Sequence, residues 1–211
     1  MDKKNLPRQI EEESFSIVEA LVDMGKFPKD QRPVIQRVVH ATGDPTVAGT
    51  MIFSDGVLPI AWDAVYSGAD IITDVEMVRI GINKKRLSGT RNSIYCAIGE
   101  EQIAQNAKKN GTTRAGEAFH YLKDKIDGGI VVVGNAPTAL FTLLEMVDNK
   151  KVRPRFVIGL PVGFVGAAES KEALAQSSIP HITNYGTRGG SPMAIATLNA
   201  LIIQAELVRR C

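Results

Sequence analysis

The 211-residue sequence predicts a single α/β domain with three layers, in which helices cover both faces of a mostly parallel, Rossmann-like sheet. Short apolar runs alternate with segments of helical spacing along most of the chain. Residues 131–133 and 156–158 are apolar at consecutive positions, which is typical of strands covered on both faces. No internal repeat, low-complexity tract or linker divides residues 1–211. Strands joined in series by helices require right-handed crossovers and therefore mostly parallel pairing.

Two helices are expected before the first strand. Residues 10–24 space their apolar side chains as one helical face. Residues 30–42 form the second expected helix, because Asp30 can cap it, Pro33 lies in its first turn and Gly43 can end it.

Strands and helices then alternate to the end of the chain. The expected strands are residues 51–53, 71–73, 94–97, 130–133, 156–160 and 181–183. The expected helices are residues 59–67, 100–110, 114–126, 138–149, 170–176 and 192–209.

The composition argues against several classes of protein. Lys and Arg number 25 against 23 Asp and Glu, so no basic excess points to nucleic acid or a membrane surface. No apolar stretch follows the first lysines, so no signal peptide is expected, and the weakly polar residues 156–168 are too few to span a membrane. Cys96 and Cys211 do not suggest a disulfide framework or a metal site, which favours the cytoplasm.

Three glycine-bearing loops follow expected strands, at residues 134–138, 161–166 and 186–191. Ligands of open α/β sheets bind beyond the carboxyl ends of the strands, and each of these loops leads into a helix N-terminus that favours anions. Any one loop could simply be a tight turn, but three on one rim favour a ligand site. Neither G-x-G-x-x-G nor a P-loop occurs. The sequence therefore predicts a bulky anionic ligand other than a standard dinucleotide.

His40 is the histidine whose position suggests chemistry. It lies in the last turn of the expected helix 30–42, where the helix dipole favours the protonated ring, so it could donate a proton near neutral pH. The alternative is a capping residue that only stabilises the helix. His120 and His181 are more simply explained as a helix-surface residue and a structural residue. Arg37 precedes His40 by one helical turn and can face the same side.

Several arginines lie near expected strand ends or loop–helix junctions. A guanidinium in such a place can bind a carboxylate in a bidentate fork, although each one alone could equally be a solvated surface charge. These arginines are Arg79, Arg91, Arg114 and Arg188.

Five segments together resemble the precorrin-8X (cobalt-precorrin-8) methylmutases. They are R-V-V-H-A-T-G-D at 37–44, D-V-E-M-V at 74–78, G-N-A-P-T-A-L at 134–140, P-V-G-F-V-G-A-A-E-S-K at 161–171 and R-G-G-S at 188–191. The similarity runs in order from about residue 10 to the C-terminal helix.

The resemblance implies an isomerase of cobalamin biosynthesis that moves a methyl group between adjacent ring carbons of (cobalt-)precorrin-8 to give (hydrogeno)cobyrinate. It implies that His40 donates or accepts the proton, without a redox cofactor or a protein-bound metal. It also implies a homodimer with its site near the subunit interface. The substrate is a tetrapyrrole-derived macrocycle fringed with carboxylates, and this agrees with the anionic ligand expected from the loops.

The expected substrate contacts come from two sources. The resemblance implies contacts from Ser14, Arg37 and the Thr113-Arg114 segment, while Ala115 departs from a serine that often follows this pair in the family and makes a hydroxyl contact there doubtful. The glycine-bearing loops and their neighbours add four further expected residues, Asn135, Gly163, Phe164 and Arg188. Two alternatives stay open from the residues: a non-catalytic tetrapyrrole carrier, and a nucleotide- or S-adenosylmethionine-dependent α/β transferase.

Overall fold

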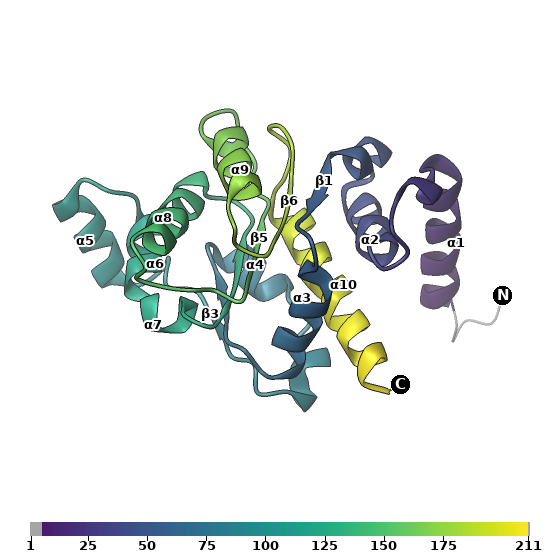
Figure 1. Cartoon of the computed structure of the whole chain (residues 1–211), viewed down its shortest axis with the longest axis horizontal. Helices are drawn as coiled ribbons and strands as arrows, with labels where there is room; N and C mark the ends of the chain where they lie inside the picture. The colour runs from purple at the N-terminus through teal and green to yellow at the C-terminus, as the bar shows by residue number, and fades with distance from the viewer. Residues whose placement is uncertain (1–5, 211) are drawn as a thin grey trace.

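The computed structural model describes residues 6–210, so residues 1–5 and Cys211 of the expected domain lie outside the described residues. The strands form one six-stranded sheet with the order β1-β6-β5-β4-β2-β3 (Figure 1). Strand β1 pairs antiparallel with β6, and the other four pairings are parallel. The predicted α/β fold with a mostly parallel sheet is confirmed.

All six expected strands are present within two residues of their expected ends. Consecutive apolar side chains in β4 and β5 are buried without exception, as strands covered on both faces require. Their bounds are β1 Met51–Phe53, β2 Ile71–Thr73, β3 Ile94–Tyr95, β4 Ile130–Val133, β5 Phe156–Gly159 and β6 His181–Asn184.

The helices differ from the expectation in several ways: the first begins four residues earlier and ends three residues earlier than expected, and α9 begins three residues earlier. Helix α4 was not expected, residues 114–126 form two helices that meet at Leu122, and Asp30 does not cap α2, whose N-cap position is Gln31. The α-helices are α1 Leu6–Leu21, α2 Arg32–Thr42, α3 Val57–Tyr66, α4 Glu76–Gly81, α5 Glu101–Asn110, α6 Arg114–Tyr121, α7 Lys123–Ile126, α8 Pro137–Asp148, α9 Ala167–Gln176 and α10 Ser191–Arg210. Short 3₁₀ helices cover Met24–Lys26, Pro45–Thr50 and Arg86–Gly89.

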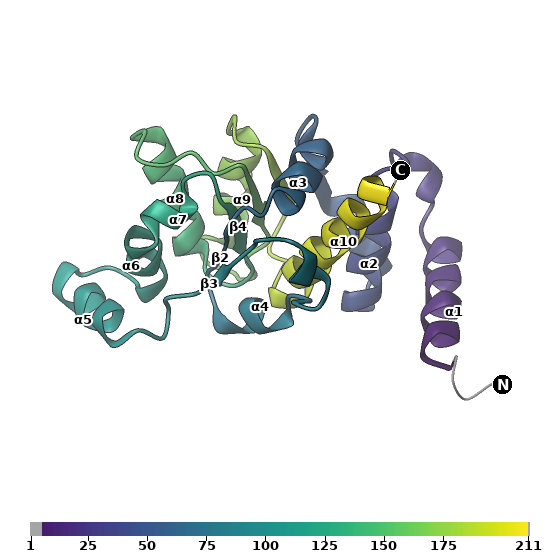
Figure 2. The same ribbon diagram turned by 90° about the horizontal axis from the view of Figure 1, so that it is seen from below.

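The sheet separates two hydrophobic clusters, and the alternation of side chains along β4 shows how. Ile130 and Val132 join the cluster formed with α2, α3, α4 and α10, whereas Val131 and Val133 join the cluster formed with α5, α6, α8 and α9 (Figure 2). Burying one such side chain contributes about 1.5–3 kcal/mol. The three layers expected from the sequence are therefore present.

Helix α10 is long and apolar enough to cross a membrane by length and composition alone. Within the window 191–209, however, 56% is buried, and α10 packs extensively against α2 and α3. Burial of this kind is typical of a core helix, and core helices can be as long and as apolar as membrane-spanning ones.

Helix α1 lies at one end of the molecule, on the outer side of α2 (Figures 1 and 2). The one side chain that it buries is Val18. Three other apolar side chains on α1, Ile10, Ile17 and Leu21, are more than half exposed. Packing within the described chain therefore uses only part of the apolar surface of α1.

Candidate functional site

His40 and Ser14 contact each other across the α1–α2 interface. The Ser14 Oγ lies 2.8 Å from the His40 Nδ1, and the Phe15 ring and the imidazole form a T-shaped pair with centroids 5.4 Å apart. His40 is exposed, and its Nε2 makes no hydrogen bond within residues 6–210. The imidazole is therefore oriented by two neighbours, while its second nitrogen remains available to a ligand.

Arg37 lies beside this pair, as its spacing from His40 predicted. Its guanidinium stacks on the Phe15 ring at 5.1 Å and forms a 3.1 Å ion pair with Glu11. Phe15 thus touches both His40 and Arg37, so the two side chains share one face of α2. Glu11 uses only part of the guanidinium, which has five N–H donors.

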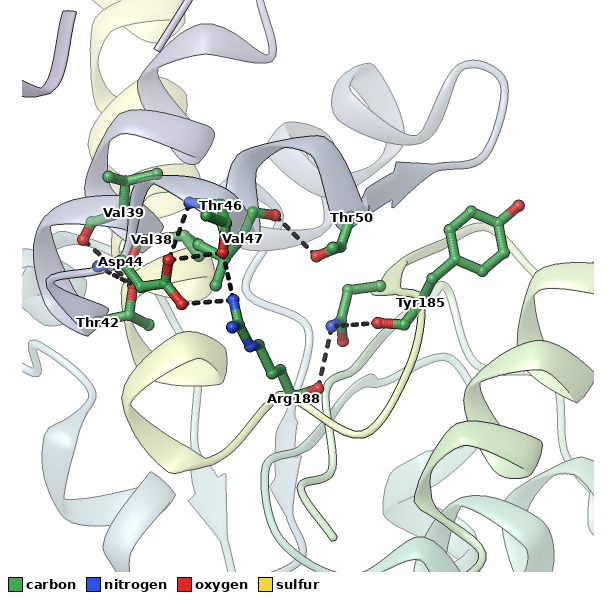
Figure 3. A network of polar contacts seen from close by, with 10 residues as sticks. Val38, Val39, Thr42, Asp44, Thr46, Val47, Thr50, Tyr185 and Arg188 are labelled. Atoms are coloured by element: carbon green, nitrogen blue, oxygen red, sulfur yellow. Dashed lines mark hydrogen bonds and ion pairs between the residues drawn. The ribbon is translucent and has the colours of Figure 1, made fainter. Parts of the chain in front are cut away.

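The segment after α2 is tied to the loop after β6. Gly43 ends α2 in a left-handed conformation (φ 64°), and Asp44 then accepts hydrogen bonds from the Thr46 amide and hydroxyl. The Arg188 guanidinium donates to both Asp44 and Thr46 (Figure 3). The Thr46 hydrogen bonds, with a further contribution from Arg188, lower the pKa of Asp44. Arg188 therefore stands beside the helix end that carries His40.

The loops after β5 and β6 form one continuous layer at the carboxyl rim of the sheet. The Gly163 amide donates to the Thr187 carbonyl at 3.1 Å, and the Gly190 amide donates to the Leu160 carbonyl at 2.7 Å. A Cβ atom on Gly189 would lie 2.4 Å from the Pro161 carbonyl oxygen, so only glycine fits there. Gly163 is thereby placed next to the loop of Arg188.

The loop after β4 does not offer the free amides that the sequence analysis expected. Asp74, directly after β2, accepts hydrogen bonds of 2.7–2.9 Å from the amides of Gly134, Asn135 and Ala136. Burial raises the pKa of Asp74, although these amides favour the carboxylate. This expectation was wrong for the first of the three loops, because an internal carboxylate already occupies its amides.

Asp74 also bears on the transferase alternative. The order of the strands reverses between β2 and β4, which is where open α/β sheets hold dinucleotides. In this chain the carboxylate of Asp74 occupies that position and uses the amides that would hold a phosphate. The geometry therefore disfavours a nucleotide at this switch point.

A second group of expected residues lies where α6 and α8 begin. Thr113 caps α6 by accepting from the Gly116 amide, and its hydroxyl donates to the Thr138 hydroxyl at 3.0 Å. Arg114 and Asn135 are exposed. A cavity of about 300 Å³ is lined by Thr112, Thr113, Gly116, His120, Thr138, Phe141, Thr142 and Glu145.

Ala115 and Phe164 take opposite positions relative to the surface. Ala115 lies on the buried face of α6, so the position that departs from the family pattern faces the core. Phe164 is 93% exposed and its neighbour Val165 is 90% exposed, both in the loop that leads into α9. Gly166 ends this loop with φ 77°. Two large apolar side chains are thus exposed to solvent at the carboxyl rim of the sheet.

The structure therefore gathers the expected residues into two groups on one rim. Ser14, Arg37 and His40 lie together at α1 and α2, Arg188 reaches the segment after α2, and Gly163 and Phe164 lie in the loop next to that of Arg188. Thr113, Arg114 and Asn135 surround the start of α8. The groups are linked because a Cβ on Gly134 would lie 3.0 Å from the Cα of Ser191, where the loop of Arg188 ends. In residues 6–210 no group of three or more His, Cys, Asp or Glu side chains could hold a metal ion.

Three residues that organise this rim were not among the expected site residues: Asp44, Asp74 and Lys171. Lys171 is 1% exposed, and its Nζ bonds to the Asn184 side chain and to the Arg188 carbonyl. All three lie within the segments that carried the resemblance. Their partners in the glycine-bearing loops are distant in the sequence and come together only through the strand order.

The other two histidines also have defined places. His181 is buried in β6, with its Nδ1 2.7 Å from the Ile179 carbonyl oxygen, and burial lowers its pKa. His120 is exposed on α6. The surface position expected for His120 is confirmed, and His181 is buried within the sheet.

Comparison with known proteins identifies the family. A family model described as precorrin-8X methylmutase matches residues 9–204. The chain is 40% identical over 200 residues to a cobalt-precorrin-8 methylmutase of Priestia megaterium, covering 95% of this chain and 89% of that protein. It is 40% identical over 196 residues to a precorrin-8X methylmutase of Pseudomonas aeruginosa, covering 92% and 94%. A crystal structure of the precorrin-8X methylmutase of Thermus thermophilus superposes with a TM-score of 0.85 at 36% identity, covering 94% and 98%. The chain belongs to the precorrin-8X methylmutase family.

Proposed function

We propose that this chain moves a methyl group between adjacent ring carbons of precorrin-8 or its cobalt form, giving (hydrogeno)cobyrinate, and that His40 transfers the proton. Membership of the family makes the chain an isomerase of cobalamin biosynthesis. The observation that carries the role of His40 is its exposed ring, which contacts Ser14 and lies beside Arg37, while Arg188 binds the segment directly after the same helix.

The contact with Ser14 leads to a specific role for each ring nitrogen. Ser14 holds Nδ1, so Nε2 of His40 is the atom that exchanges a proton with the macrocycle. Protonation of the conjugated system draws electron density from the carbon that the methyl group leaves. The proton returns to Nε2 when the product forms, so the reaction neither gains nor loses atoms. General acid–base catalysis of this kind is worth about 10²–10⁴-fold in rate.

The two arginines would bind carboxylates at the edge of the macrocycle. Arg37 and Arg188 each have one acidic neighbour, Glu11 and Asp44, but retain donors for a ligand carboxylate. In our proposal Thr113, Arg114 and Asn135 contact the part of the ring that reaches α6 and α8. The Gly163-Phe164 loop supplies apolar contact to the ring face, which agrees with the exposed side chain of Phe164.

A homodimer is part of the proposal, and the outer face of α1 supports it. Ile10, Ile17 and Leu21 are 56%, 55% and 63% exposed on this one helix. An exposed apolar stripe is typical of an interaction surface, and this one lies on the helix that carries Ser14. A second copy docking here would bring the interface close to His40. A cytoplasmic location, expected from the near-neutral charge and the sparse cysteines, also belongs to the proposal.

The oligomeric state can be tested with a double substitution on α1. Ile17→Glu with Leu21→Glu should yield monomers in analytical ultracentrifugation, because charges replace the apolar stripe. Tyr121→Glu is the matched control, since Tyr121 is 57% exposed at the end of α6 on the other side of the sheet. A wild-type monomer, or a dimer that survives the α1 change, would exclude this interface.

The activity is tested by incubating the chain with metal-free and with cobalt-loaded precorrin-8 and following the visible spectrum. Conversion to the corrin product supports the proposal and shows which form is used. Binding without conversion of either form would instead indicate a tetrapyrrole carrier. A thermal shift with a nucleotide or S-adenosylmethionine, without conversion, would indicate a transferase.

A further inference from the structure

Lys171 carries an ammonium group that is buried in the fold. It lies on α9 with 1% of its surface exposed, and its Nζ is 3.1 Å from the Asn184 Oδ1 and also donates to the Arg188 carbonyl. No carboxylate of residues 6–210 lies within ion-pair distance of the ammonium. Both acceptors are therefore neutral oxygen atoms.

Burial of an ammonium group between neutral acceptors destabilises the folded state. Removing an ammonium from water costs free energy that two neutral acceptors only partly offset. Burial accordingly lowers the pKa of Lys171 to about 8. An unbranched apolar residue such as methionine would fill the same space without this penalty, but it would offer no donor to the loop beyond β6.

The contacts of Lys171 converge on the backbone of Arg188. The Asn184 Nδ2 donates to the Tyr185 carbonyl at 3.1 Å and to the Arg188 carbonyl at 3.0 Å. Because Lys171 donates to the Asn184 side-chain oxygen and to the same Arg188 carbonyl, it joins β6 to its loop. The backbone carbonyl of Arg188 is thus fixed by hydrogen bonds from Lys171 and Asn184.

The side chain of Arg188 is held on the other side, beside α2. Its guanidinium donates to Asp44 and Thr46, just beyond the helix end that carries His40 (Figure 3). A continuous set of hydrogen bonds therefore runs from Lys171 through the Arg188 backbone and side chain to the segment next to His40. A displacement of the Arg188 carbonyl would move the guanidinium relative to the imidazole.

We propose that Lys171 is a positioning residue for the methylmutase reaction, because its hydrogen bonds to Asn184 and Arg188 aim the Arg188 guanidinium at a substrate carboxylate beside His40. The inference rests on the proposed role of Arg188 in binding substrate. Lys171 does not touch the substrate and acts only through Arg188. Loss of Lys171 should therefore affect binding of the macrocycle more than the chemical step.

The test is a double-mutant cycle with Lys171→Met and Arg188→Ala, using the corrin product as the titrated ligand and precorrin-8 for kinetics. Arg188→Ala should weaken product binding, and Lys171→Met should weaken it about tenfold, as expected for loss of hydrogen bonds to a charged group. The kcat of Lys171→Met should stay within about threefold of wild type, since His40 is untouched. Combined with Arg188→Ala, Lys171→Met should cause no further loss. Lys109→Met, an exposed lysine on α5, is the control and should change neither quantity.

Two outcomes would overturn the inference. If Lys171→Met binds product like wild type, or loses as much affinity in the Arg188→Ala background as alone, Lys171 does not act through Arg188. If Arg188→Ala itself leaves binding unchanged, the proposed substrate contact of Arg188 fails and the inference fails with it. Should Lys171→Met not fold, Lys171→Gln removes the charge while keeping a shorter donor, and the same cycle applies to it.

Discussion

The buried ammonium of Lys171 makes the stability of this protein depend on pH in a predictable direction. Burial lowers the pKa of Lys171 from 10.5 to about 8, so the folded state releases this proton before the unfolded state does. Between these two values the unfolded chain binds more protons, and stability attributable to Lys171 therefore rises with pH. Below about pH 8 the ammonium is charged in both states, and the full burial penalty is present.

The size of the effect follows from the same change in pKa. A fall from 10.5 to about 8 corresponds to about 3–4 kcal/mol, at about 1.4 kcal/mol for each change of one in pKa. Near pH 9.5, where titration is incomplete, about 2 kcal/mol should have been recovered relative to neutral pH. For a chain of this length that is about 4–8 °C in melting temperature.

The assay compares wild type with Lys171→Met by chemical unfolding at several pH values. Other groups also titrate in this range, but they are common to both proteins and cancel in the difference. The free energy of unfolding of wild type should gain on that of the variant as the pH rises from about 7 to about 9.5. Lys109→Met should show a difference from wild type that does not change with pH. If the difference in the free energy of unfolding between wild type and Lys171→Met also did not change with pH, the proposed burial of a charged Lys171 ammonium would be refuted.

Three further substitutions test other parts of the rim. Ser14→Ala should lower kcat about tenfold, a smaller fall than removal of the His40 side chain would cause, because the imidazole remains but loses its orienting partner. Steady-state kinetics with precorrin-8 measures this change. Glu11→Gln removes a negative charge from Arg37 and should tighten product binding by a factor of about 1.5–5, measured by absorbance titration; weaker binding would contradict the proposed role of Arg37. Asp74→Asn leaves at least one buried amide without an acceptor, and removal of the buried charge offsets only part of this cost. The free energy of unfolding should therefore fall by about 1 kcal/mol in a urea titration, and an unchanged midpoint would contradict this.

Much of the fold could be predicted because local sequence and final burial agree. The consecutive apolar residues of β4 and β5 are buried on both faces, as their pattern predicted. Helix α4 escaped prediction because it is six residues long and its apolar side chains do not gather on one face: Val78 is buried, whereas Met77 and Ile80 are exposed. The break at Leu122 carries no glycine or proline to mark it.

The site was less predictable, because its contacts join distant segments. The spacing of Arg37 and His40 already placed them on one face of a helix. The contact between Ser14 and His40, by contrast, depends on how α1 packs on α2, which no local pattern specifies. Asp74 meets the loop after β4 only because β2 and β4 are neighbours in the sheet.

The role of His40 is tested most directly by the turnover of His40→Ala with precorrin-8, measured together with product affinity. Loss of the proton-transferring group should reduce the rate by about 10²–10⁴-fold. Product should still bind within a few-fold of wild type, because the arginines and loops of the rim are unchanged. Turnover close to wild type in a folded, product-binding variant would contradict the proposal that His40 transfers the proton.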